Sequence, residues 1–261
     1  MTASRANLPK AMQGDPSLHD PDIPVPPPGE DELPFDDGEP METNEHRLQM
    51  VLLIQSLKEA WANRDDFFVA GNMFVYFSET QVKHNDFRGP DVFVVLGTTR
   101  RSRKSWVAWG EGGKLPDVVI ELLSFRTRAI DRGEKMRIYS KVWRTPEYFL
   151  YDPISHEFEG YRLDPITLDY VPIEADARGD IESGVLRLRL GVREGTFEDV
   201  TRPWLRWLDS AGVPLSTPQE RADAEQRRAD SAQQRADAEQ RRADALEARL
   251  RELEKARSGE R

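Results

Sequence analysis

Short apolar runs bounded by turn residues occupy the middle of the chain, and each predicts a buried strand. The predicted strands are 67–77 with a break near Gly71, 91–96, 106–109, 118–123 and 147–151. Apolar residues at helical spacing predict helices at 44–63, with Asn44 as a cap, and from about 129 to 142. After Pro153 the alternation continues as β-hairpins at 156–162, 168–173 and 185–190. These elements indicate an α/β fold with one sheet and an appended β meander.

The two ends of the chain differ from this central region, residues 42–215, in composition. Residues 1–41 are rich in proline and acidic residues, and they predict a disordered arm because little apolar surface is available to offset chain entropy. From Arg221 the seven-residue repeat RADAEQR begins, and it predicts a coiled-coil helix over 218–257. Two interpretations of this helix stay open. It is either an oligomerisation zipper or a solvated single helix held by charge pairs, since Glu225 and Glu239 occupy positions in the apolar seam.

Overall composition excludes several classes of protein. A chain of 261 residues with 38% hydrophobic residues can bury one good core. Cysteine is absent, which excludes disulfides and zinc sites made of thiolates. No stretch approaches the roughly 20 apolar residues of a membrane span, and the N-terminus lacks the apolar core of a signal peptide. We therefore expect a soluble, cytoplasmic protein.

The formal net charge of -10 is unevenly distributed along the chain. Residues 1–45 carry a net charge of −9, whereas residues 98–144 carry +7. Local potential rather than the overall isoelectric point governs the docking of a polyanion. The basic segment is therefore compatible with a nucleic-acid partner.

Glu121 interrupts an otherwise apolar run, Val-Val-Ile-Glu-Leu-Leu, at 118–123. Burying an unpaired carboxylate costs several kcal/mol because a low-dielectric interior cannot replace its hydration. Such a group is normally paired, protonated or bound to a metal. We therefore expect Glu121 to have a function.

Two further aspartates could approach Glu121. Asp117 lies on the same strand, and at about 3.3 Å rise per residue it is roughly 13 Å away, too far to share an ion. Asp91 opens the neighbouring strand and can approach Glu121 across a pairing distance of about 5 Å. That pair could hold Mg²⁺ with water as the remaining ligands. Because Pro-Asp is also ordinary turn chemistry, Asp91 alone is equally well explained as a turn residue.

Four motifs occur in order along the chain: FRGPDV at 87–92, PDVVIELLS at 116–124, DRGEK at 131–135 followed by Tyr139, and TPEYFLYDP at 145–153. With these motifs the chain resembles the PD-(D/E)XK nuclease superfamily and, within it, the Uma-type (Uma-two) restriction-endonuclease-like family. The resemblance runs from about Met41 to Asp209. It implies a restriction-endonuclease-like mixed sheet flanked by helices.

The resemblance also implies a metal site. Asp91 and Glu121 would bind Mg²⁺, with Mn²⁺ as an alternative, and the backbone carbonyl of Leu122 would be a further ligand. Phosphodiester hydrolysis needs an activated water and neutralisation of charge on the phosphate, which a cation held there would provide.

In one respect the chain departs from the superfamily pattern. The lysine expected two residues after the glutamate is replaced by Leu123. The resemblance suggests that Lys135, on the following helix, supplies the catalytic ammonium instead. The acid expected on the first helix is either Glu42 or Glu45, and the role of the neighbouring His46 is open.

The function expected from these features is Mg²⁺-dependent endonucleolytic cleavage of DNA, with the coiled-coil segment 218–257 mediating homo-oligomerisation or contact with a protein partner. The basic residues expected to contact phosphates are Arg100, Arg101, Arg103, Lys104, Arg126, Arg128 and Arg132. Two alternatives stay open. One is a catalytically silent nuclease fold that binds nucleic acid or, through its coiled coil, a protein, and the other is an enzyme that cleaves RNA.

Overall fold

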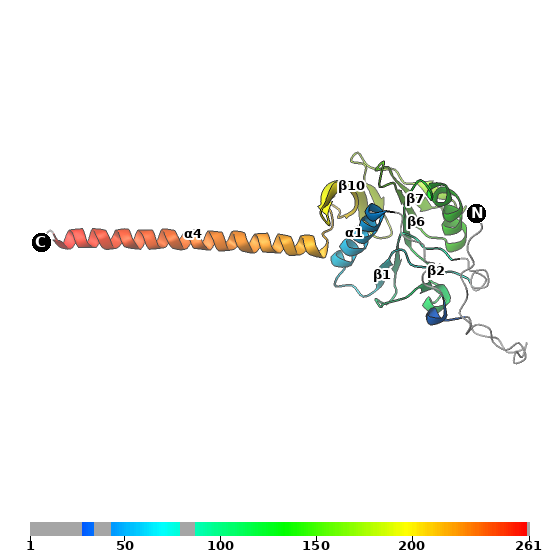
Figure 1. Cartoon of the computed structure of the whole chain (residues 1–261), viewed down its shortest axis with the longest axis horizontal. Helices are drawn as coiled ribbons and strands as arrows, with labels where there is room; N and C mark the ends of the chain where they lie inside the picture. The colour runs from blue at the N-terminus through cyan, green and yellow to red at the C-terminus, as the bar shows by residue number, and fades with distance from the viewer. Residues whose placement is uncertain (1–27, 34–42, 79–86, 260–261) are drawn as a thin grey trace, which may run out of the picture. The chain divides into compact units, whose positions relative to one another are not determined.

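The computed structural model describes residues 28–33, 43–78 and 87–259 (Figure 1). Its central sheet has six strands in the order β1-β3-β5-β6-β7-β8. The strands are β1 (Phe67–Ala70), β3 (Val92–Leu96), β5 (Val118–Leu122), β6 (Glu147–Tyr151), β7 (Phe158–Leu163) and β8 (Tyr170–Pro172). Neighbouring strands are antiparallel except β5 and β6, which are parallel. The predicted α/β class, with a mixed sheet and helices, is confirmed.

Two smaller sheets accompany the central one. The parallel strands β2 (Val75–Tyr76) and β4 (Trp106–Val107) form the first. The antiparallel strands β9 (Ile181–Ser183), β10 (Leu188–Phe197) and β11 (Val200–Leu208) form the second. The hairpin pattern at 185–190 predicted only the beginning of β10, and β11 was not predicted. Pro203 interrupts the apolar alternation of β11, which masks the strand in the sequence.

Helical segments flank the central sheet. They are the short 3₁₀ helices η3 (Glu30–Glu32) and η4 (Ala108–Glu111), the helix α1 (Asn44–Ala60), and a continuous helical stretch made of α3 (Arg128–Ile130) and the π-helical turns η5 (Asp131–Lys135) and η6 (Ile138–Trp143). The predicted cap of α1 is wrong by one residue, because Thr43 accepts the N–H of His46. The predicted strand 106–109 is shorter than expected, since η4 begins at Ala108.

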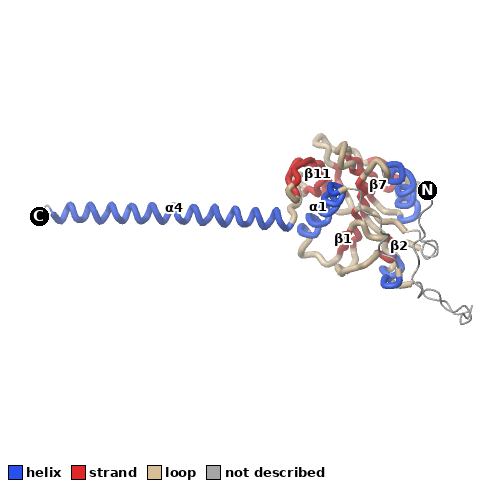
Figure 2. Tube along the Cα trace, in the orientation of Figure 1, coloured by secondary structure: helices blue, strands red, loops and turns tan. Residues whose placement is uncertain are grey.

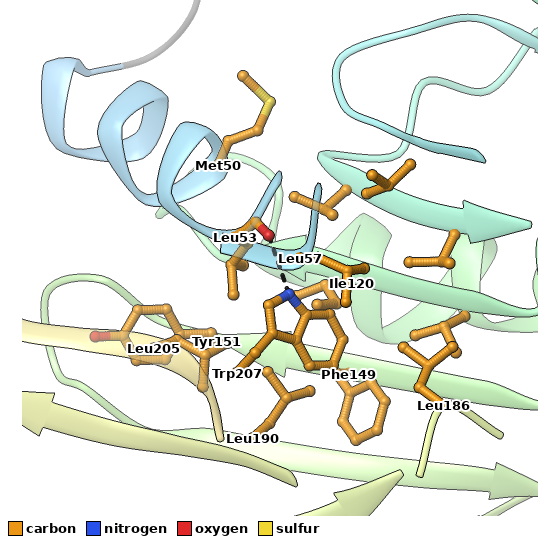
Figure 3. Packing of buried hydrophobic residues seen from close by; sticks show 14 of the residues in the cluster. Met50, Leu53, Leu57, Ile120, Phe149, Tyr151, Leu186, Leu190, Leu205 and Trp207 are labelled. Atoms are coloured by element: carbon orange, nitrogen blue, oxygen red, sulfur yellow. Dashed lines mark hydrogen bonds between the residues drawn. The ribbon is translucent and has the colours of Figure 1, made fainter. Parts of the chain in front are cut away.

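The largest apolar cluster lies between one face of the central sheet, α1 and the three-stranded sheet (Figure 3). Leu53 and Leu57 of α1 pack here with Ile120 of β5 and Trp207 of β11. The indole N–H of Trp207 donates to the carbonyl of Leu53 at 3.1 Å, which ties β11 to α1. This cover makes β5 a fully buried strand.

The opposite face of the central sheet is covered by the helical stretch that begins at Arg128. Val119 of β5 and Leu123, just after it, belong to this second cluster, together with Ile138 and Tyr139 of η6. Side chains alternate along a strand, so Glu121 points to this same face. The alternation therefore directs the carboxylate toward the helix that carries Lys135.

The two ends of the chain are described only in part. Of the arm predicted at 1–41, residues 1–27 and 34–41 lie outside the described residues. The intervening residues 28–33 contain η3, and Leu33 is buried with Phe74, Tyr76 and Val107, so this short piece is ordered. In the sequence, the indication of this contact was Leu33, an apolar residue within an acidic, proline-rich segment.

The chain divides into two compact units, Met1–Leu215 and Ser216–Arg261. The second consists mainly of α4 (Pro218–Gly259), which Figure 2 shows as one uninterrupted helix. Within the part of the chain that is described, no helix has the length and apolar character needed to cross a membrane.

Candidate active site

Glu121 is completely buried on β5, and both of its carboxylate oxygens have partners. Oε1 accepts a hydrogen bond from the hydroxyl of Tyr139 at 2.7 Å. Oε2 lies 2.9 Å from the ammonium of Lys135 and 3.4 Å from the backbone N of Asp91. The carboxylate predicted to be buried here is therefore contacted by three groups, one from η5, one from η6 and one from the residue before β3.

Asp91 directly precedes β3 and is oriented by two contacts. Its Oδ1 lies 2.8 Å from Nε2 of His46, and its Oδ2 accepts the backbone N–H of Leu122 at 2.7 Å. The chain after β1 passes close to this residue, since a Cβ built on Gly71 would come within 2.1 Å of the carbonyl oxygen of Asp91. Only glycine therefore fits at position 71 with this backbone.

Lys135 lies between two buried carboxylates. Its ammonium is 2.9 Å from Oε2 of Glu121 and also 2.9 Å from Oδ1 of Asp131, one helical turn earlier. Asp131 is 1% exposed, and neither of its oxygens accepts a well-oriented hydrogen bond from the described residues. The nearby charge of Lys135 is thus the main compensation for Asp131.

The charges in this cluster shift one another's protonation. Burial, together with the negative charges of Asp91 and Asp131, raises the pKa of Glu121 to about 8, although Lys135 opposes the rise. Burial also raises the pKa of Asp131. For Asp91, burial is outweighed by the contacts with His46 and Lys135, so its pKa is lowered. Three carboxylates around one ammonium leave excess negative charge, which favours taking up a proton or a cation.

For Lys135, the neighbouring charges outweigh the effect of burial on the pKa. Burial would lower the pKa of its ammonium, but the surrounding carboxylates of Glu121, Asp91 and Asp131 raise it above the usual range. Lys135 therefore stays positively charged at neutral pH. A permanent positive charge can stabilise an anion or orient a water, but it cannot act as a general base.

The structure brings Glu121 of β5 and Lys135 of η5 together with Asp91, which directly precedes β3. Their catalytic and metal-binding roles stay predictions. Leu122 adjoins them, and its N–H binds Asp91. Of the two acids considered on the first helix, Glu45 is exposed and Glu42 lies outside the described residues.

Three contributors to the site were given no role by the sequence: His46, Asp131 and Tyr139. Asp131, Lys135 and Tyr139 follow one another at intervals of four residues, which places them on one side of a helix. This spacing could have identified Asp131 and Tyr139 from the sequence. His46 is separated from Asp91 by 45 positions, and no local pattern connects them.

Asp117 is at the entry of β5, where its Oδ2 accepts the N–H of Leu96 at 2.7 Å. It thus helps to join β3 to β5. The expectation that Asp117 is too far from Glu121 to share an ion stays a prediction.

Side chains of the basic turn at 100–104 form more contacts within the protein than the sequence indicates. Arg103 has a fully buried side chain, which forms a bidentate pair with Glu111 at 2.7 and 2.9 Å and lies over the rings of Phe68 and Trp106. Lys104 contacts Asp31 at 2.7 Å. The expectation that Arg103 contacts a phosphate is therefore wrong in this structure.

The carboxylates of the site are chemically suited to a hard divalent cation, but they are too few to complete its coordination. Asp91 and Glu121 offer carboxylate oxygens, and the excess negative charge of the cluster would be neutralised by a cation. Among the described residues, no group of three His, Cys, Asp or Glu side chains is arranged to hold a metal ion. A cation such as Mg²⁺, which keeps several waters and needs only one or two carboxylates, fits these residues best.

Comparison with known proteins gives a family match and two matching chains among solved structures. The family model described as "Uma2: Putative restriction endonuclease" matches residues 27–197, more than half of the chain. The chain is also similar to the crystal structure of a putative nuclease belonging to DUF820 from Anabaena variabilis, with 18% sequence identity and a TM-score of 0.39. That similarity covers 58% of this chain and 87% of the other. No curated protein matches the chain.

Proposed function

Because the chain belongs to the Uma2 family, we propose that it is a Mg²⁺-dependent endonuclease that hydrolyses DNA phosphodiester bonds. The observation that carries the proposal is the clustering of Asp91, Glu121 and Lys135, where Lys135 pairs with Glu121, the backbone N of Asp91 contacts Glu121, and the charges shift one another's pKa. Hydrolysis of a phosphodiester requires charges of both signs close together, to hold a cation and to stabilise the phosphate.

Asp91 and Glu121 are proposed to hold the cation, with the backbone carbonyl of Leu122 as a further ligand. Bound there, Mg²⁺ or Mn²⁺ would act as a Lewis acid and lower the pKa of water. The chain's own contribution is orientation. His46 and the N–H of Leu122 fix the carboxylate of Asp91, while Tyr139 fixes that of Glu121.

Lys135 is proposed as the catalytic cation. Its ammonium keeps its proton, so it can donate hydrogen bonds to a phosphate oxygen as negative charge accumulates there. Asp131 holds the same ammonium from the other side at 2.9 Å, which limits where it can move. Lys135 thereby takes the role assigned elsewhere in the superfamily to a lysine at the position of Leu123.

Charge supports a nucleic-acid substrate. Residues 98–144 carry a net charge of +7, and the residues after β5 supply Arg126, Arg128 and Arg132. Counterion release from phosphates would make the affinity decrease steeply with salt. DNA is proposed as the substrate, with RNA as the alternative that the same charges would accept.

Plasmid nicking by purified full-length protein, in Mg²⁺, Mn²⁺ or EDTA, tests the proposal. Asp91→Asn and Glu121→Gln are each expected to reduce nicking to the level seen in EDTA, because each removes a ligand charge. Glu182→Gln is the matched control, since Glu182 is an exposed acid on β9, which contributes no residue to the proposed site. Undiminished nicking by either site variant would reject the metal-site assignment.

A second candidate is a nuclease fold that binds without cleaving. It is favoured by the absence of a three-donor metal group within the described residues, and by the contacts of Tyr139 and Lys135 with both oxygens of Glu121. Calorimetric titration with Mn²⁺ separates the two candidates. Binding that disappears in Glu121→Gln supports the enzyme, whereas no binding and no cleavage of DNA or RNA by the wild-type chain supports the silent fold.

A further inference from the structure

Two large and strongly exposed apolar side chains lie just beyond the ends of the neighbouring parallel strands β5 and β6. Phe125 is 99% exposed and Ile154 is 82% exposed, and both line one cavity of about 630 Å³. A single exposed apolar residue is ordinary, but two that share a concave surface indicate a contact surface for another molecule. The remaining wall of this cavity contains Arg128 and Arg132.

Local hydrogen bonds hold both side chains outward. The hydroxyl of Ser124 accepts the N–H groups of Arg126 and Thr127, at 3.2 and 3.1 Å, so Phe125 occupies the tip of a tight turn. The N–H of Ile154 is bound at 2.8 Å by Oδ1 of a carboxylate two residues earlier. The ring of Phe125 is therefore displayed from a backbone that is already ordered, which reduces the entropy lost on binding.

Both arginines of the cavity are paired with acids, and Arg128 is held so that its positive charge faces outward. Arg128 pairs with Asp152, and the guanidinium side chain is 46% exposed whereas the carboxylate side chain is only 4% exposed. Arg132 pairs with Glu159 through two contacts of 2.5 and 2.7 Å. An incoming anion therefore meets the arginine at the first of these pairs and not its carboxylate.

The cavity and the proposed reaction site share the same supporting elements. Phe125 follows Glu121 by four residues, just beyond the end of β5, and Arg132 is adjacent to Asp131 in η5. Residues 124–137 carry a net charge of +3. An exposed aromatic ring with cationic neighbours is the combination that binds single-stranded nucleic acid, where bases stack on the ring and phosphates contact the cations.

We propose that this cavity takes an unstacked base of the substrate strand, with Phe125 as the stacking surface and Arg128 and Arg132 beside the flanking phosphates. The proposal rests on the nuclease function proposed above and specifies its substrate class. A base inside a duplex has both faces covered by its neighbours, so only an unpaired nucleotide can occupy the cavity. The preferred substrate is then a single strand, a flap or a frayed end next to the scissile phosphate.

The test is fluorescence anisotropy of full-length protein in EDTA, with one labelled DNA oligonucleotide presented as a single strand and as a blunt duplex. Wild-type protein is expected to bind the single strand about ten-fold more tightly than the duplex. Phe125→Ala should lose about ten-fold in single-strand affinity, and Phe125→Trp should retain it, because each stacked base contributes strongly to affinity. Ile166→Ala is the matched control, since Ile166 is 90% exposed and does not line the cavity.

Phe125→Leu separates stacking from general apolar contact. If this variant binds the single strand as tightly as wild type, or if Phe125→Ala has no effect, the base-stacking proposal is overturned. The former outcome would indicate general apolar contact with the strand instead of base stacking. All these variants change a side chain that is almost fully exposed, so the fold should be retained, and a melting curve checks this.

The two proposals can fail separately. Stacking-dependent binding without any metal-dependent cleavage would support the base cavity and reject the enzyme. Cleavage of blunt duplex that is unaffected by Phe125→Ala would support the enzyme and reject the base cavity.

Discussion

Two acid–base pairs with the same order and spacing occur in very different surroundings. In η5, Asp131 precedes Lys135 by four residues, and their side chains are 1% and 17% exposed at 2.9 Å. In α4, Glu247 precedes Arg251 by four residues, and their side chains are 67% and 76% exposed at 3.5 Å. The first pair belongs to a charged cluster that includes Glu121, whereas the second lies in water. Spacing alone thus forms an ion pair, and burial decides whether it affects chemistry.

The difference arises from what each helix packs against. The helix containing η5 and η6 covers one face of the central sheet with Ile138, Tyr139 and Trp143, so the adjacent charges are buried as well. In α4 even the three leucines of the seam, Leu246, Leu250 and Leu253, are between 58% and 65% exposed. The helix α4 is instead stabilised by side-chain hydrogen bonds between residues four positions apart, such as Gln240 with Asp244 at 2.8 Å.

Replacing the basic residue of each pair should give the largest difference in the free energy of unfolding. Lys135→Met is expected to lower the free energy of unfolding by about 4 kcal/mol, because it leaves buried carboxylates without their counter-charge. Arg251→Met, the matched change, should alter it by less than about 0.5 kcal/mol. Urea unfolding without metal measures both. Equal values for the two variants would contradict the contrast drawn between the pairs.

The next largest effect should be the pH dependence of the free energy of unfolding. The pKa of Glu121 is raised to about 8 in the folded protein, so between its ordinary value and pH 8 the native state binds more protons than the unfolded chain. Stability without metal should therefore decrease as pH rises from about 5 to about 8, by an amount on the order of 3 kcal/mol. Asp131, whose pKa is also raised, acts in the same direction, while the raised pKa of Lys135 matters only above this range.

Glu121→Gln provides the control for that pH dependence. The variant cannot ionise at this position, so most of the decrease in stability should disappear, and the variant should melt above wild type at pH 8 in EDTA. Melting temperatures across the pH range measure it. A wild-type stability that rises steadily from pH 5 to pH 8 would contradict the raised pKa.

The helix α4 should matter for association more than for the stability of the first unit. If Leu246, Leu250 and Leu253 form a zipper, Leu250→Glu should dissociate the oligomer at micromolar concentration, because a charge in the seam would be desolvated. Sedimentation of the full chain, of Leu250→Glu and of a chain truncated after Thr217 measures this. Identical association for all three would reject the zipper and leave a solvated helix.

The smallest effect is expected from that truncation on the first unit itself. The chain divides at Leu215, and the heptads of α4 share neither the composition nor the periodicity of the α/β region. Removal of residues after Thr217 should therefore leave the thermal transition and any nicking activity unchanged. A large drop in melting temperature would show that the first unit depends on α4.

Much of the fold could be predicted because its signals are local. The runs at 92–96, 118–122 and 147–151 are long enough in apolar residues to be strands buried on both faces, and all three lie in the central sheet. The seven-residue repeat likewise predicted a long helix. Glu121 was identifiable as a candidate because a carboxylate in such a run must find a partner, whatever the topology.

Other features depended on which elements pack together. Arg103, in a segment typical of an exposed basic turn, is buried because Glu111, Phe68 and Trp106 happen to surround it. The sequence contains the residues of that contact but no period that links them.

The sequence by itself determined the strands of the central sheet, the long helix and the identity of the buried acid, since burial patterns and heptads are properties of neighbouring residues. The tertiary structure alone decided that His46 of α1 meets Asp91, that Tyr139 and Lys135 hold Glu121, and that Leu122 presents its N–H to Asp91. These contacts join residues between 14 and 45 positions apart. They form only when helices pack on a particular face of the sheet, which is set by the shape and burial of the whole core.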